Sequence, residues 1–226
     1  MLNKSYYIRS CKPFEQNNMK KIVILTFLIF LSIKSYSQSD KELVLKSFEN
    51  YKNAILTDKG KLAADFVDSR TINYYSTILD KVKTADSLEV DSMGIIDKLT
   101  VLTMRHRVAK NDLLNFNGKD LVVYAIDNGM VGKNSVVNAE LGNVITNGDF
   151  SKAEFVVNGQ KTPFFFHFYR EDKVWRIDIT HLFSLGTMSF KKMIDDSGET
   201  ENDFITNILE VLTGKKPTEN IWKSVI

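Results

Sequence analysis

The segment from Ser135 to Thr180 constrains the fold of this chain more than any other stretch of it. Its apolar residues alternate with polar ones, which is the period of a half-buried β-strand. Asn-Gly dipeptides at 147–148 and 158–159 interrupt the alternation, and Asn-Gly is a strong signal for a tight hairpin turn. The pattern predicts four antiparallel strands, at about 135–146, 150–157, 162–169 and 174–180.

Helical periodicity fills the chain on both sides of this segment. Ser39 followed by Glu42 has the spacing of a capping box and opens the first predicted helix. Further helices are predicted near 61–67, 71–82, 92–106, 119–127, 182–194 and 200–213, where apolar residues recur three and four apart. Helices followed by a meandering antiparallel sheet are typical of an α+β fold. We expect the N-terminal helices to pack on a curved antiparallel sheet of about four strands, with extra helices at the C-terminus.

The N-terminal region has the features of a secretory signal peptide. Lys20 and Lys21 precede an uncharged apolar run, Ile22–Ile33, and the small residues Ser35 and Ser37 follow it. The run has about half of the ~20 residues that a membrane-spanning helix needs. We expect cleavage after Ser37 and a periplasmic or secreted mature chain with no stable membrane anchor. A short membrane anchor or a buried helix is the alternative interpretation.

The predicted leader, residues 1–37, changes the charge and cysteine balance of the chain. It contains six of the 30 Lys and Arg residues and one of the 28 Asp and Glu residues, which leaves 24 basic and 27 acidic side chains. A slightly acidic chain is a poor candidate for binding nucleic acid. The single cysteine, Cys11, also lies in the leader, so the mature chain has no disulfide. We expect 38–226 to form one α+β domain, with 181–226 as a helical C-terminal extension.

The last predicted hairpin divides the aromatic residues between two faces. A loop of two or four residues around Glu171 and Asp172 places Tyr169 opposite Val174 and His167 opposite Arg176. One face is then apolar, and the N-terminal helices are its natural cover: Phe164, Phe166, Phe168, Trp175, Ile177 and Ile179. The other face is mixed: Glu154, Phe165, His167, Tyr169, Arg176, Asp178 and Thr180. A three-residue loop would instead bring His167 inside.

The hairpin sequence FFFHFYREDKVWRIDIT, with Trp-Arg-Ile-Asp at 175–178 after a charged turn, resembles the nuclear transport factor two-like superfamily over roughly residues 40–180. The resemblance implies a cone-like fold with a pocket between sheet and helices. Some members are isomerases, dehydratases or epoxide hydrolases, and many others bind ligands or partners without catalysis. Residues expected near such a pocket are Tyr74, Tyr75, Tyr124, Asp127, Phe164, Phe166, Phe168 and Trp175.

Three functions remain open at this point. The leading hypothesis is an exported non-catalytic domain that binds a small apolar ligand or a protein partner. The second is an isomerase or hydrolase with its pocket between sheet and helices, and the third is a structural homodimer that uses Phe165, Tyr169 and Val174. No catalytic set, metal site or cofactor is predicted, because the three histidines fall in separate elements. Candidates for a surface or dimer face are Phe165, His167, Tyr169, Arg176 and Asp178.

The signal-peptide interpretation predicts the first residue of the exported protein. Cleavage after Ser37 makes Gln38 the new N-terminus, and N-terminal sequencing or intact mass of the exported protein measures it directly. A protein that keeps Ile22–Ile33 in the membrane fraction would instead support the membrane-anchor alternative.

Overall fold

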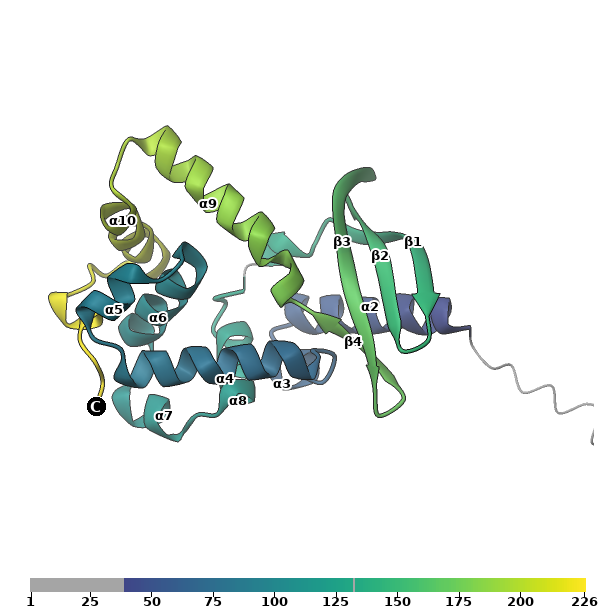
Figure 1. Ribbon diagram of the computed structural model, residues 1–226, viewed down its shortest axis with the longest axis horizontal. Coiled ribbons are helices and arrows are strands. Elements are labelled where there is room, and N and C mark those ends of the chain that lie inside the picture. Colours follow the sequence, from purple (N-terminus) through teal and green to yellow (C-terminus); the bar gives the residue numbers. More distant parts are fainter. Residues whose placement is uncertain (1–38, 132) are drawn as a thin grey trace, which may run out of the picture. The chain divides into compact units, whose positions relative to one another are not determined.

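The computed structural model describes residues 39–131 and 133–226, and Ser39–Ile226 form one compact unit. Within this part of the chain, nine α-helices and one four-stranded antiparallel sheet make an α+β fold (Figure 1). The predicted signal peptide and its cleavage point lie outside the described residues.

The helices before the sheet are α2 (Asp40–Leu56), α3 (Gly60–Ala64), α4 (Ser69–Thr84), α5 (Ser87–Ser92), α6 (Ile95–Arg107), α7 (Lys110–Asn115) and α8 (Gly118–Asp127). After the short 3-10 helix η1 (Lys133–Ser135) come β1 (Ala139–Asn147), β2 (Phe150–Val157), β3 (Gln160–Glu171) and β4 (Val174–Asp178). The chain continues through η2 (Thr180–Leu182), α9 (Phe183–Ser197), α10 (Glu201–Thr213) and η3 (Glu219–Trp222).

Local sequence signals explain most helix ends. Ser39 and Glu42 form the predicted capping box at the start of α2. Gly214 ends α10 in the left-handed region, with φ 69°, as its position after the last apolar residue predicts. The short helices α5 and α7 were not predicted, because each buries a single residue, Val90 or Leu113, and one buried position shows no helical period. The helix predicted at 92–106 begins later, at Ile95, because Gly94 is its N-cap.

The sheet is the predicted meander, in the order β1-β2-β3-β4. The prediction of the last register was wrong: Tyr169 pairs with Arg176 and His167 with Asp178. The loop consists of Asp172 and Lys173, both with positive φ (50° and 67°), so the turn lies further along the chain than expected. The register is therefore shifted by two residues, and a shift of two leaves the side chains of β3 and β4 on their predicted faces. Ile179 and Thr180 lie beyond the end of β4.

The apolar face of the sheet is covered by α2, which crosses behind the strands in Figure 1 and contacts both β1 and β4. The Phe48 ring lies 5.0 Å from the Phe166 ring, and Phe168 and Trp175 are buried beside them. The Ser47 hydroxyl donates a hydrogen bond to the carbonyl oxygen of Trp175, which ties α2 to β4 as well. Helices α3 and α8 complete this first hydrophobic cluster.

The other helices form a second hydrophobic cluster away from the sheet. Its fully buried members come from α4, α5, α6, α7, α8 and α10 and include Val82, Val90, Leu102, Leu121 and Leu209. Buried Lys98 ties α10 to α6 through Glu201 at 2.8 Å and reaches Asp91 at 3.6 Å. Among the described helices, α2 contacts β1 and β4, while α3 packs on α2 and α8. Helices α4 to α7 instead bury their apolar faces mainly against one another and α10.

A short segment joins the two clusters at the outer edge of β4. The amide of Ile177 donates to the carbonyl of Phe66 at 2.8 Å, and the amide of Asp68 donates to the carbonyl of Ile177 at 3.0 Å. Asp68 is also the N-cap of α4, since its side chain accepts from the Thr71 amide at 2.9 Å. The same residues thus close the sheet edge and start the longest helix of the second cluster.

Two phenylalanines of β3 on opposite faces test the division of the sheet into two faces. Phe168 has 0% of its surface exposed, whereas Phe165 is only half-buried on the opposite face. We expect Phe168→Ala to lower the free energy of unfolding by about 3–5 kcal/mol, because it leaves a cavity in the first cluster. Phe165→Ala should cost about 1 kcal/mol or less. Urea unfolding of both variants measures the difference, and equal losses would contradict the assigned faces.

Candidate functional site

Aromatic and imidazole rings gather on the face of the sheet opposite α2. We call Phe150, Phe165, His167, Tyr169 and His181 the outer-face cluster. Successive residues of β3 alternate between faces, so three of these rings lie on one side of that strand. The Phe150 ring meets His167 edge-on at 5.1 Å and lies 5.3 Å from Tyr169. The four strand residues are half-buried and His181 is exposed, so the cluster is open to solvent.

Two cationic side chains lie over rings of the outer-face cluster. The Arg70 guanidinium is 3.4 Å from the centre of the Tyr169 ring, and the Lys152 ammonium is 5.4 Å from that of Phe165. Cations above aromatic faces are attracted by the ring quadrupole. Arg70 also pairs with the buried carboxylate of Asp68 at 3.2 Å, which links this face to the start of α4.

The closest ring contact in the cluster is between two histidines. The His167 and His181 rings are stacked with their centres 3.4 Å apart and their planes 18° from parallel. Burial lowers the pKa of His167, and the nearby His181 and Lys152 lower it further, while Asp178 opposes them. His167 lies on the mixed face, as predicted, because it alternates along β3 with buried Phe166 and Phe168. Its contact with His181 was not predicted, since nothing in the sequence reports how a turn folds back on a strand.

Asp178 is a correction to the predicted surface face. It is buried, with 7% of its surface exposed, and one carboxylate oxygen accepts hydrogen bonds from the amide and the hydroxyl of Thr180. Asp178 thus shapes the turn into η2 rather than facing solvent. Arg176 is half-buried and pairs with Glu171 at 3.3 Å. Asp178 and Arg176 are less exposed than predicted, because the segment before α4 packs along the edge of β4.

Three of the predicted pocket residues belong to the hydrophobic core. Phe166, Phe168 and Trp175 have 5%, 0% and 2% of their surfaces exposed and lie in the first cluster with α2. Side chains packed in this way fill the space that a pocket between sheet and helix would occupy. Phe164, near the start of β3, is only half-buried. The prediction that Phe166, Phe168 and Trp175 line a pocket was therefore wrong. The sequence did not reveal this, because the same apolar pattern is expected for a sheet face that lines a cavity and for one that packs on a helix.

The predicted helix tyrosines lie in three different surroundings. Tyr74 on α4 donates a hydrogen bond to the carboxylate of Asp97 on α6. Burial and the neighbouring Asp97 raise the pKa of Tyr74, so the phenol keeps its proton. Tyr124 donates to the carbonyl of Arg107 at 3.3 Å. The Tyr74–Asp97 pair links two helices, and sequence reasoning missed Asp97 because no spacing relates residues on separate helices.

Tyr75 does line a cavity, although not the predicted one. Burial raises the pKa of Tyr75 to about 12. The cavity measures about 170 Å³ and lies among α4, α6, α8 and the following loop. Its lining is mainly apolar, with three hydroxyls: Tyr75, Leu99, Thr100, Thr103, Met104, Leu121, Ala125, Met130 and Val131.

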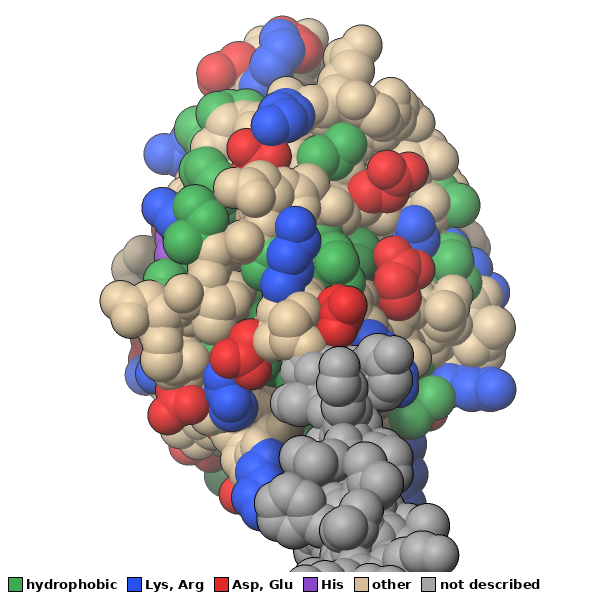
Figure 2. Space-filling view, turned by 90° about the vertical axis from the view of Figure 1, so that its right-hand side faces the viewer, with side chains coloured by type: hydrophobic (Ala, Val, Ile, Leu, Met, Phe, Trp, Pro, Cys, Tyr) green, Lys and Arg blue, Asp and Glu red, His purple; other side chains and the backbone are tan. Residues whose placement is uncertain are grey.

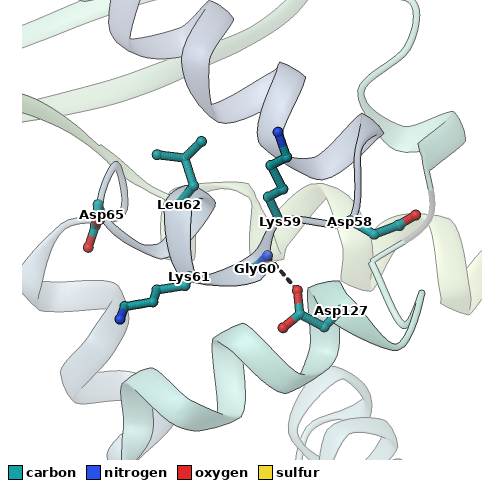
Figure 3. Close-up of a pocket in the computed structure, with 7 residues that line it drawn as sticks. All are labelled: Asp58, Lys59, Gly60, Lys61, Leu62, Asp65 and Asp127. Carbon is teal, nitrogen blue, oxygen red and sulfur yellow. Dashed lines mark hydrogen bonds between the residues drawn. The ribbon is translucent and has the colours of Figure 1, made fainter.

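A larger hollow of about 500 Å³ lies on the surface beside α3 (Figure 3). Asp127, the last of the predicted pocket residues, lines it and accepts a hydrogen bond from the Gly60 amide at 2.5 Å. Figure 3 shows the side chains of Asp58, Lys61 and Asp65 pointing away from one another. Asp58 and Asp65 also pair with lysines outside the hollow. The hollow thus lacks the convergent polar groups that a catalytic site needs.

Several kinds of site receive no support from the part of the chain that the structure describes. In residues 39–131 and 133–226, no group of three or more His, Cys, Asp or Glu side chains could hold a metal ion. Among these same residues, no helix is both long and apolar enough to cross a bilayer. Figure 2 looks onto the sheet side of the molecule, where side chains of both charges are interspersed with hydrophobic ones rather than gathered by sign.

The comparisons with known proteins add no functional assignment to this geometry. No protein-family model, curated protein or solved structure matches the chain.

The lowered pKa of His167 predicts a loss of stability in weak acid. An unfolded histidine has a pKa near 6.5, so below that pH the unfolded chain takes up a proton that the folded chain resists. The contribution of His167 is thus fully present above about pH 6.5 and is lost as the pH falls toward the folded pKa. His167→Phe keeps a ring in place and should reduce the fall in unfolding free energy between pH 7.5 and 5.

The matched control is His106→Gln, at the histidine that bonds the Thr213 hydroxyl away from the sheet. Urea unfolding at both pH values gives the comparison. If His167→Phe loses as much stability in acid as the unsubstituted protein does, His167 is not the cause.

Proposed function

We propose that this chain is an exported, non-catalytic binding domain whose outer sheet face docks a second copy of the same chain. The observation that carries the proposal is the contrast between the two faces of the sheet. The apolar face is occupied by α2, whereas the outer face keeps half-buried aromatic rings in contact with solvent. Aromatic residues and arginine are enriched at protein interfaces, where they contribute much of the binding energy.

The charges around the outer-face cluster favour a second copy over a strongly charged partner. Glu154 pairs with Lys161 at 2.8 Å, Glu171 with Arg176 at 3.3 Å and Asp68 with Arg70 at 3.2 Å. A two-fold interface brings the same surface together with itself, so a strong net charge there would repel. The internal pairing of these charges removes that repulsion and leaves the aromatic rings as the contact.

The packing of α2 on the sheet supports a second proposal, that the chain is related to the nuclear transport factor two-like superfamily. A long helix, α2, lies across an antiparallel meander, and the hairpin with Trp175 to Asp178 forms its last two strands. Fold kinship alone does not choose a function. The enzyme alternative loses support because Phe166, Phe168 and Trp175 fill the core instead of lining a pocket.

A small apolar ligand is the second candidate function, and the cavity beside Tyr75 favours it. Its volume, about 170 Å³, is close to that of a cavity of about 150 Å³ that takes up benzene in another protein. The ligand would be a single small ring or a short chain, with the hydroxyls of Tyr75, Thr100 and Thr103 available to one polar group.

A native mass spectrum, repeated after denaturation, tests both candidates. We expect a dimer that Phe165→Asp together with Tyr169→Asp converts to monomer, because two carboxylates would be buried at the contact. Val211→Asp is the matched control, since Val211 is 81% exposed on α10, outside the outer-face cluster. A monomer at all concentrations would contradict the dimer. Ala125→Phe places a large ring in the cavity lining. A ligand in the cavity would appear as extra mass on the native unsubstituted protein, would be lost on denaturation, and would be absent from the Ala125→Phe variant.

A further inference from the structure

The stacked histidines join two elements that the chain separates. His167 lies in β3, and His181 lies in η2, the turn that leads directly into α9. We propose that the His167–His181 stack is a pH-sensitive clasp, which holds η2 and the start of α9 against the sheet and opens when both rings carry a proton. The inference concerns contacts within one chain and does not depend on the proposed dimer.

The clasp matters because α9 packs on the other helices through half-buried side chains, among them Phe190 and Ile194 against the second cluster. Among the described residues, none of the 15 that form α9 is fully buried. The ring of Phe183, its first residue, lies 4.7 Å from Tyr74. Helices with few buried apolar contacts belong to the parts of a protein that open at low cost. A change at His181, two residues before α9, therefore acts beside a helix none of whose described residues is fully buried.

The groups that face the two rings determine how many protons the stack accepts. Asp178, which pairs with His167 from β4, favours one positive charge. Lys152, the partner of His167 in β2, disfavours it. From α4, Arg70 adds positive charge over the neighbouring Tyr169, and Tyr74 stays protonated and neutral.

A second proton on the stack is therefore repelled by the first proton and by Lys152, and the Asp178 carboxylate offsets this repulsion in part. Two cationic rings stacked with their centres 3.4 Å apart repel each other. The stack is thus compatible with one added proton and incompatible with two.

His181→Phe is the variant that isolates this effect, because it keeps a stacked ring that takes up no proton. Proton NMR of the three histidines between pH 5 and 8 should show the midpoint of His167 rising in His181→Phe, since one source of repulsion is gone. His106→Gln, at the third histidine of the chain, should leave the His167 midpoint unchanged.

Hydrogen exchange reports the opening itself. After correction for intrinsic exchange rates, the amides of residues 181–186 in the unsubstituted protein should lose about tenfold or more of their protection between pH 7.5 and 5, as expected for strongly coupled rings. The same amides in His181→Phe should keep a constant protection. Amides of α2 serve as the internal control for global unfolding.

Two results would overturn the clasp. The first is an unchanged His167 midpoint in His181→Phe. The second is an equal loss of protection at pH 5 in the variant, or in α2 of the unsubstituted protein. Sedimentation at both pH values separates the outcomes, because a change of oligomeric state without a change at residues 181–186 would concern the dimer and count against the clasp.

Discussion

The hydrogen-bonded contact between the Phe66–Thr71 segment and the edge of β4 is the constraint on which the rest of this structure depends. It pairs both backbone groups of Ile177 and so closes a sheet edge that would otherwise be open. It also starts α4 at a capped and buried Asp68. Since α4 contributes to the second cluster, this one contact fixes where the helical cluster stands against the sheet.

The same contact explains the position of the histidine stack. The Thr71 hydroxyl accepts a hydrogen bond from the Ile179 amide at 3.0 Å, directly after β4 ends. Asp178 then turns the chain through its bonds to Thr180, and the next residue, His181, reaches back over His167. The outer-face cluster is therefore built by the strands together with the turn that α4 holds in place.

The two faces of the sheet differ in what covers them. The side facing α2 is a packed core, in which Phe48, Phe166 and Trp175 exclude a ligand. The outer side keeps its rings half-exposed, and there Glu154 pairs with Lys161 and Glu171 with Arg176. This contrast supports the proposed binding role of the outer side, whereas the packed inner side stabilises the fold. The cavity beside Tyr75 belongs to the helices and is independent of both.

The sequence by itself determined the fold class, the meander and the side of the sheet on which each aromatic residue lies. Those features depend on local signals, namely period-two alternation and Asn-Gly turns, and the faces survived an error of two residues in the last register. Only the tertiary structure decided that α2 fills the apolar face, that Asp178 is buried, and that Tyr74 meets Asp97 and His167 meets His181. These outcomes depend on contacts between residues distant in the chain, and neither periodicity nor spacing encodes such contacts.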